Sequence, residues 1–183
     1  MKTVNLVVFT GYPHSGKTTI ANFLVKHGFL RLEIDQIRKE LFGRGFPNVN
    51  DEEERLARLT FQYRKADILA SGKSVMLDSC SISKVDRQEN FLIPDFVENS
   101  LRKQKMKLRK YLIFLDVKRK IIIKRNISDN REKKALLDIL GKIDKSWQDP
   151  KSYNSKDVKL LVYKNNTKQD LENIKVSLRK LLK

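Results

Sequence analysis

The fold is decided by Gly11-Tyr12-Pro13-His14-Ser15-Gly16-Lys17-Thr18, which fits the pattern G-x-x-x-x-G-K-[S/T]. An apolar run at residues 4–10 comes directly before it and predicts a strand that is buried on both faces. A helical pattern follows at once, from about residue 16 to residue 27. A glycine-rich turn between a strand and a helix N-terminus offers backbone N–H groups to phosphate. The stretch therefore predicts a phosphate-binding loop.

In a loop of this kind the lysine reaches the β- and γ-phosphates of a nucleoside triphosphate, and the hydroxyl that follows is a ligand of Mg²⁺. These roles fall to Lys17 and Thr18. We therefore expect ATP and Mg²⁺ as cofactors, although the sequence does not distinguish ATP from GTP. The expected ATP-binding residues are the loop and the residue after it: Gly11, Tyr12, Pro13, His14, Ser15, Gly16, Lys17, Thr18 and Thr19.

Composition is that of a globular domain in a reducing compartment. Of the 183 residues 40% are hydrophobic and 33% are charged, and Cys80 is the single cysteine, so no disulfide can form within the chain. No apolar run approaches the ~20 residues of a membrane helix. The apolar run Leu6–Phe9 is also too short for the core of a signal peptide. We expect a cytoplasmic protein without a membrane partner.

The net charge of +17 is concentrated in the second half of the chain. Residues 1–100 carry 14 basic and 13 acidic residues, whereas residues 101–183 carry 25 basic and 9 acidic residues. Such a surface attracts anionic partners, including nucleic acid. The alternative is that the charge reflects lysine-rich composition, with the side chains solvated around the helices.

Strand and helix patterns alternate along the chain. We expect strands at residues 4–10, 30–35, 75–78, 111–116 and 158–163, and the basic run at residues 102–110 is expected to end a helix. Alternation of this kind predicts a parallel sheet with helices on both faces. The predicted fold class is α/β, a single-domain P-loop NTPase fold over residues 1–183 with strand order 2-3-1-4-5 and a lid segment at about residues 125–135.

A GTPase is the first alternative to consider. Thr167-Lys168-Gln169-Asp170 resembles a guanine-reading N/T-K-x-D element, but it also fits a helix-capping box. The D-x-x-G match, which begins at Asp138, lies in a helical pattern and not after a strand, so it cannot hold a metal and a γ-phosphate. The capping interpretation is the simpler one.

Asp35 is predicted to stand at the carboxyl end of the second strand, where open parallel sheets bind their ligands. An aspartate there can accept the proton of an attacking hydroxyl. Arg38 lies one helical turn further on the same face and can hold an anionic part of the acceptor. The alternative is that Asp35 is only the N-cap of a short helix and Arg38 a surface residue.

At this point the chain resembles the group of kinases that includes polynucleotide 5′-hydroxyl kinases, zeta toxins and adenylylsulfate kinases. The resemblance covers most of the chain. It rests on the loop, on Asp35-x-x-Arg38 followed by Glu-Leu-Phe-Gly, on Gly72-Lys-Ser-Val-Met-Leu-Asp78 with Arg87 nine residues later, on Arg125 and Arg131, and on Trp147-Gln-Asp-Pro150. The Gly-Leu-Tyr-Lys-Lys pattern of adenylylsulfate kinases is missing. The resemblance implies that Asp35 is a general base, that Arg87 binds substrate with Asp35 and Arg38, and that the segment around Arg125 and Arg131 is a lid.

The remaining candidates carry more than one interpretation. Asp78 ends the third strand and can hold Mg²⁺ through water, contact the substrate, or cap a turn. Arg125 and Arg131 can stabilise the charge of the transferring phosphoryl group, or lie in solvent. Trp147 fits the core better than it fits stacking on a nucleotide base.

Together these features predict a kinase that transfers the γ-phosphoryl group of ATP to a hydroxyl of an anionic acceptor. The leading acceptor is a nucleic-acid 5′-hydroxyl. A small-molecule alcohol, such as a nucleotide, sugar or antibiotic, is the first alternative, and a nucleotide-gated RNA-binding module without transfer activity is the second. The sequence does not indicate an oligomeric state.

Overall fold

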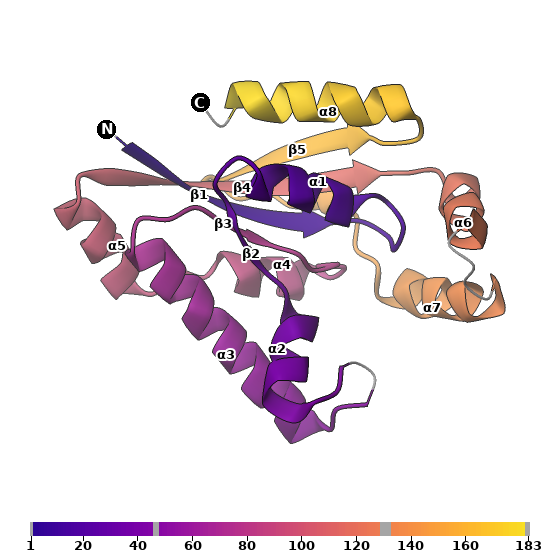
Figure 1. Ribbon diagram of the computed structural model, residues 1–183, viewed down its shortest axis with the longest axis horizontal. Helices are drawn as coiled ribbons and strands as arrows, with labels where there is room; N and C mark the ends of the chain where they lie inside the picture. The colour runs from indigo at the N-terminus through magenta and orange to yellow at the C-terminus, as the bar shows by residue number, and fades with distance from the viewer. Residues whose placement is uncertain (1, 46–47, 129–132, 182–183) are drawn as a thin grey trace.

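The sheet predicted from the sequence is present in the computed structural model, which describes residues 2–45, 48–128 and 133–181. Within these residues five strands pair in parallel, in the order β2-β3-β1-β4-β5 (Figure 1). The strands are β1 (Lys2–Thr10), β2 (Leu30–Leu32), β3 (Val75–Leu77), β4 (Met106–Asp116) and β5 (Val158–Lys164). The predicted α/β fold class and strand order are therefore confirmed.

Helices connect the strands and cover both faces of the sheet (Figure 1). They are α1 (Lys17–Val25), α2 (Ile34–Phe42), α3 (Asp51–Ala70), α4 (Lys84–Phe91), α5 (Asp95–Lys103), α6 (Arg119–Ser128), α7 (Lys133–Ser146) and α8 (Lys168–Leu181), with a 3₁₀ turn at Pro150–Ser152. Helices α1 and α8 lie on one face, and α3, α4 and α5 lie on the other.

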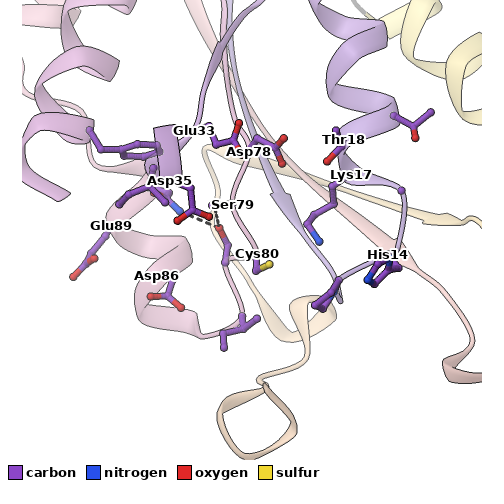
Figure 2. Close-up of a pocket in the computed structure, with 18 of the residues that line it drawn as sticks. His14, Lys17, Thr18, Glu33, Asp35, Asp78, Ser79, Cys80, Asp86 and Glu89 are labelled. Carbon is purple, nitrogen blue, oxygen red and sulfur yellow. Dashed lines mark hydrogen bonds between the residues drawn. The ribbon is translucent and has the colours of Figure 1, made fainter. Parts of the chain in front are cut away.

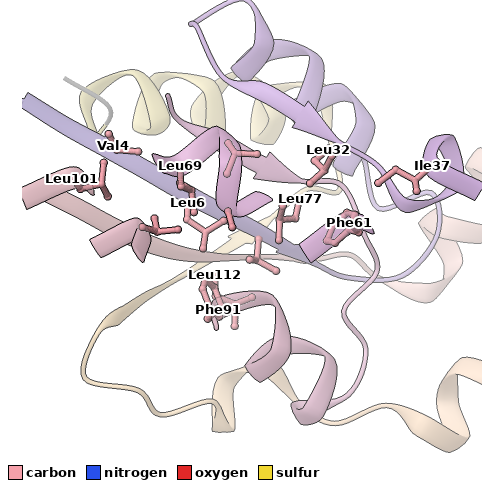
Figure 3. Close-up of a cluster of buried hydrophobic side chains, with 14 of the residues drawn as sticks. Val4, Leu6, Leu32, Ile37, Phe61, Leu69, Leu77, Phe91, Leu101 and Leu112 are labelled. Atoms are coloured by element: carbon pink, nitrogen blue, oxygen red, sulfur yellow. The ribbon is translucent and has the colours of Figure 1, made fainter. Parts of the chain in front are cut away.

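Alternate residues of β1 supply the two hydrophobic cores. Leu6 and Val8 pack with Phe61, Leu69 and other residues under α3 to α5 (Figure 3). Val7 and Phe9 point the other way and pack with residues of α1 and α8. A strand buried on both faces in this way holds its carboxyl end firmly, and that end carries the phosphate-binding loop.

Strand β4 is longer than predicted, and this corrects the helical assignment of the basic run. Residues 106–110 belong to the strand and pair with β1 from Lys2↔Met106 to Leu6↔Lys110. Lys107 and Arg109 alternate with the half-buried Leu108, which is the period of a strand with one solvated face. The helix α5 ends before this run, at Lys103.

Two smaller features concern the ends of β2 and β5. Strand β2 ends at Leu32, so Asp35 lies in the first turn of α2 and not at the strand end. After β5, Thr167 and Asp170 form a reciprocal cap for α8, with the Asp170 N–H donating to Thr167 Oγ1 at 3.1 Å and the Thr167 N–H donating to Asp170 Oδ2 at 3.0 Å. The capping interpretation of this segment is thus confirmed.

Among the described helices, none is long and apolar enough to cross a membrane.

Candidate active site

The loop between β1 and α1 has the backbone that its glycines permit. Gly11 and Gly16 have positive φ values of 144° and 96°, and His14 also has a positive φ of 58°. A Cβ atom at Gly16 would lie 2.4 Å from Asn165 Nδ2, so a larger residue there would have to displace the Asn165 amide. Lys17 is nearly buried, and its Nζ donates to the carbonyls of Gly11 at 2.9 Å and Tyr12 at 2.8 Å. The lysine side chain therefore folds back over the loop and bonds to its carbonyls.

Asn165 and Arg125 hold the loop from outside. Asn165 follows β5, is buried, and donates from Nδ2 to the carbonyl of Ser15 at 2.7 Å. Arg125, on α6, donates to the carbonyls of His14 at 3.1 Å and Asn165 at 2.8 Å. The predicted catalytic residue Arg125 thus lies at the loop, and it lines a large cavity together with loop residues such as Lys17. Its predicted partner Arg131 lies outside the described residues, and so does the centre of the predicted lid, residues 129–132.

Tyr12 links the loop to α7. Its hydroxyl donates to Asp144 Oδ1 at 2.8 Å, and its ring stacks on Trp147 with 4.6 Å between centroids. Burial, together with the hydrogen bond to Asp144, raises the pKa of Tyr12 to about 12. Trp147 is half-buried, also contacts Phe114 and does not line the cavity, so it packs against aromatic side chains of the protein.

Asp35 lies across the cavity from Lys17 (Figure 2). Its carboxylate is half exposed, and Arg38 Nη1 lies 2.5 Å from Asp35 Oδ1. Arg38 is itself buried and grips both oxygens of Glu54, from Nε at 2.7 Å and from Nη2 at 2.8 Å. Glu33, and not Asp35, occupies the N-cap position of α2. The first turn of α2 therefore presents Asp35 to the cavity in an orientation that Arg38 fixes.

The charges of this cluster reinforce one another. Burial disfavours the charge on Arg38, but its bonds to Glu54 and Asp35 outweigh burial and hold the pKa of Arg38 above its ordinary value. Burial also disfavours the charge on Glu54, and its bonds to Arg38 and Arg58 likewise outweigh it and hold the pKa of Glu54 below its ordinary value. The guanidinium of Arg38 is thus engaged by carboxylates of the protein.

Asp78 directly follows β3 and lies in the cavity between Asp35 on one side and Thr18 and Lys17 on the other (Figure 2). Its side chain is nearly buried, and Oδ2 lies 2.6 Å from Arg31 Nη2. The same guanidinium lies 3.0 Å from Glu33 Oε2. Among the described residues there is no group of three or more His, Cys, Asp or Glu side chains that could hold a metal. Oxygen donors for a hard cation come instead from Thr18 and Asp78, both in the cavity lining.

Arg87 differs from Asp35 and Arg38, the other predicted substrate-binding residues, because it does not line the cavity. Its side chain is fully buried and donates to the carbonyls of Ser81 and Ile82, both at 3.1 Å, and of Gln148 at 2.8 Å. Burial lowers the pKa of Arg87 from its ordinary value. These bonds tie the segment after β3 to the segment after α7, so the side chain is not presented to a substrate.

The cavity has a volume of about 1750 Å³ and runs from the loop to α3 and α4. Of the predicted site residues, those in its lining are Pro13, His14, Gly16, Lys17, Thr18, Thr19, Asp35, Arg38, Asp78 and Arg125. Residues that the sequence analysis missed include Arg55, Arg58 and Asn165. The position of Asn165 directly after a strand was a usable signal, whereas Arg55 and Arg58 lie in a helix whose sequence has no motif.

Comparison with known proteins agrees with this architecture. The chain superposes on an unliganded sugar kinase from Janibacter sp. HTCC2649 with a TM-score of 0.63 at 18% identity, covering 97% of this chain and 95% of that one. It also superposes on a fungal RNA kinase (TM-score 0.62, 16% identity, 100% and 87% covered). A third structure is the Mycobacterium tuberculosis APS kinase CysC in complex with AMPPNP and APS (TM-score 0.56, 17% identity, 100% and 99% covered).

At these identities the likeness shows the fold alone, and it is shared by kinases that differ in their acceptors. No curated protein matches the chain in sequence. The family model AAA_33, described as an AAA domain, matches residues 6–135, which include the phosphate-binding loop, Asp35 and Asp78. The chain therefore belongs to the AAA_33 family of P-loop domains and has a kinase-like fold.

Proposed function

We propose that this protein is a kinase that transfers the γ-phosphoryl group of ATP to a hydroxyl of an acceptor. The observation that carries the proposal is the placement of Asp35 in one cavity with Lys17 and Thr18. A loop that binds phosphates needs no carboxylate across from it for nucleotide binding alone. A carboxylate at that position supports the handling of a proton on a second substrate.

The proposed reaction follows from these positions. ATP phosphates enter the loop, and Lys17 exchanges the carbonyls of Gly11 and Tyr12 for the β- and γ-phosphates. The acceptor oxygen bonds to the γ-phosphorus while the bond from that phosphorus to the β–γ bridging oxygen breaks, and ADP leaves. The hydroxyl proton passes to Asp35. Because the transition state is loose, positioning and charge contribute more than the basicity of Asp35.

The cation and the arginines complete the charge balance. Thr18 would hold Mg²⁺ directly and Asp78 would hold it through water, and the cation would supply positive charge against the β- and γ-phosphates. Arg125 orders the loop through its hydrogen bonds to His14 and Asn165, and its guanidinium stabilises the negative charge of the transferring phosphoryl group. For Arg131 we keep the role in the lid that the sequence predicts. Arg38 acts as a positioning residue for Asp35.

A nucleic-acid 5′-hydroxyl is the acceptor that we favour. The strongly basic second half of the chain supports it, and Lys124, Arg125 and Lys168 from that half line the cavity. A small-molecule alcohol is the alternative, since a cavity of about 1750 Å³ accommodates ATP together with a small acceptor. We place the reaction in the cytoplasm, where ATP is present and the exposed thiol of Cys80 stays reduced.

The direct test is transfer of ³²P from γ-labelled ATP to 5′-hydroxyl oligonucleotides and to mixtures of metabolites. Lys17→Ala should abolish transfer. Asp35→Asn should lower kcat by about 10²- to 10⁴-fold, the range for loss of a general base, while ATP binding measured by calorimetry stays within about twofold. Asp67→Asn is the matched control, because Asp67 is exposed on α3 outside the cavity.

Two outcomes would contradict the proposal. If Asp35→Asn weakened ATP binding as much as it slowed transfer, Asp35 would be a structural residue. If the protein bound ATP with Mg²⁺ but labelled no acceptor, and bound RNA only when ATP was present, it would be a nucleotide-gated RNA-binding module without transfer activity.

A further inference from the structure

One face of α3 forms the wall of the cavity beyond Asp35. Arg55, Arg58, Leu59 and Gln62 all line the cavity, and their spacing of three, four and seven residues places them on one side of the helix. Both arginines are exposed. Because α2 packs on α3 and Arg58 shares Glu54 with Arg38, this wall is continuous with the cluster that holds Asp35.

The acidic side chains that line the same cavity already have partners. Glu33 and Asp78 pair with Arg31, and Asp35 pairs with Arg38. Asp86 accepts from the N–H of Ser83, and Glu89 lies 3.9 Å from Arg58. Arg55, in contrast, makes no hydrogen bond or ion pair with any residue in the described part of the chain. The α3 wall therefore carries a cationic group that the protein itself does not neutralise.

The arginine expected to hold an anion cannot do so in this arrangement. Three nitrogens of Arg38 contact Glu54 and Asp35, and its side chain is 8% exposed. An anionic group on the acceptor would have to displace one of these carboxylates. Recognition of an anion near Asp35 therefore falls to the neighbouring helix.

The cavity lining also exposes apolar surface, from Leu59 on the α3 wall and from Leu92 directly after α4. Leu59 is 56% exposed and Leu92 is 66% exposed, and both line the cavity. Two large apolar side chains in the lining favour a ligand with a planar or apolar body, whereas a neutral sugar requires a lining dominated by hydrogen-bonding groups. This part of the lining therefore suits a ligand that has both an anionic group and a flat apolar part.

We propose that Arg55 and Arg58 bind a phosphate group of the acceptor while Leu59 and Leu92 contact its planar part. The inference rests on the proposed kinase function and assigns the residues that select its second substrate. Guanidinium groups bind phosphate through paired hydrogen bonds, which explains why arginine and not lysine occupies both positions. The acceptor is thus a phosphate-bearing molecule of nucleotide type.

The test uses two probes that offer the same 5′-hydroxyl and differ by one phosphate, adenosine and adenosine 3′-phosphate. Calorimetry in the presence of ADP should show that adenosine 3′-phosphate binds at least about tenfold more tightly than adenosine, because charge-assisted hydrogen bonds are among the stronger hydrogen bonds. Arg55→Ala and Arg58→Ala should each lower that ratio of affinities by about tenfold and leave ADP binding unchanged. Arg64→Ala on the same helix, outside the cavity, should have no effect.

A 5′-hydroxyl decanucleotide with the same terminal unit separates the two sources of such a phosphate. Tighter binding of the decanucleotide assigns a nucleic-acid end, and equal binding assigns a free nucleotide; in both cases the affinity must depend on Arg55. The inference is overturned if the two adenosine probes bind equally, or if neither arginine substitution changes binding. If binding follows the inference but ³²P is transferred to no acceptor, the kinase function alone is wrong.

Discussion

At the scale of single residues, the contact between Gly16 and Asn165 governs the shape of the phosphate-binding loop. Gly16 leaves room for the Asn165 amide, and that amide donates to the carbonyl of Ser15. The loop is therefore held by a residue from the opposite end of the chain, 150 positions away. The pattern of the loop explains the need for a flexible backbone at Gly16, but only the structure explains the need for space.

We expect Gly16→Ala to abolish the stabilisation of the protein by ATP, because the new Cβ would lie 2.4 Å from Asn165 Nδ2. The measurement is the rise in Tm on addition of ATP and Mg²⁺. Gly28→Ala is the matched control: its φ is 88°, similar to that of Gly16, but no atom lies within 4 Å of the added Cβ. It should cost about 1 kcal/mol of stability from backbone strain and keep the full ATP response. Equal loss in both variants would assign the effect to strain alone.

At the scale of secondary-structure elements, the pairing of α2 with α3 positions Asp35. Glu54 of α3 accepts from Arg38 of α2 and from Arg58 of its own helix. Sequence reasoning placed Asp35 and Arg38 correctly on one face, yet it could not identify Glu54, because the partner comes from a helix 16 residues further along the chain and no motif joins the two.

This pairing should make the stability of the protein sensitive to acid. The pKa of Glu54 is lower in the folded protein than its ordinary value of 4.5, so the stabilisation is complete above pH ~4.5 and is lost as the pH falls through the folded-state value. Urea unfolding of the wild type and of Glu54→Gln should therefore differ at pH 7, by about 1–3 kcal/mol, and converge at lower pH. A difference that stayed constant with pH would exclude the ion pair as its cause.

How far the sequence predicts the structure is clearest in the elements. The order of the strands and the position of the loop follow from apolar runs and glycines, which are local signals. The start of β4 does not, because the basic run before Tyr111 looks helical until β1 is seen to extend back to Lys2 and pair with it. Arg87 shows the same limit in the site: the resemblance to known kinases implied substrate binding, whereas the structure buries the side chain against three carbonyls.

At the scale of the whole molecule, the net charge of +17 bears on the choice of acceptor. The first hundred residues, which supply the loop, Asp35 and the α3 wall, are nearly neutral, so the excess charge lies on the elements from α5 onwards. Lys124, Arg125 and Lys168 carry part of this charge into the cavity lining, and a polyanionic acceptor would depend on the charge more strongly than a small acceptor. The salt dependence of acceptor affinity therefore distinguishes the two classes of acceptor.

We expect the affinity for a 5′-hydroxyl oligonucleotide to fall by about tenfold or more between 50 and 200 mM salt, as three or more phosphate contacts require. Fluorescence anisotropy with a labelled oligonucleotide measures this slope, and a mononucleotide of the same base serves as control with a shallower slope. If the oligonucleotide were as indifferent to salt as the mononucleotide, the basic surface would be solvated composition and a small-molecule acceptor would be favoured.

The stacking of Tyr12 on Trp147 has a practical consequence. Trp147 is the single tryptophan of the chain, and its ring lies 4.6 Å from a residue inside the loop that receives the triphosphate. Any shift of that loop on loading changes the surroundings of one indole and of no other. The protein thus carries its own optical probe, so that nucleotide arrival can be followed by stopped-flow emission without a dye or a label.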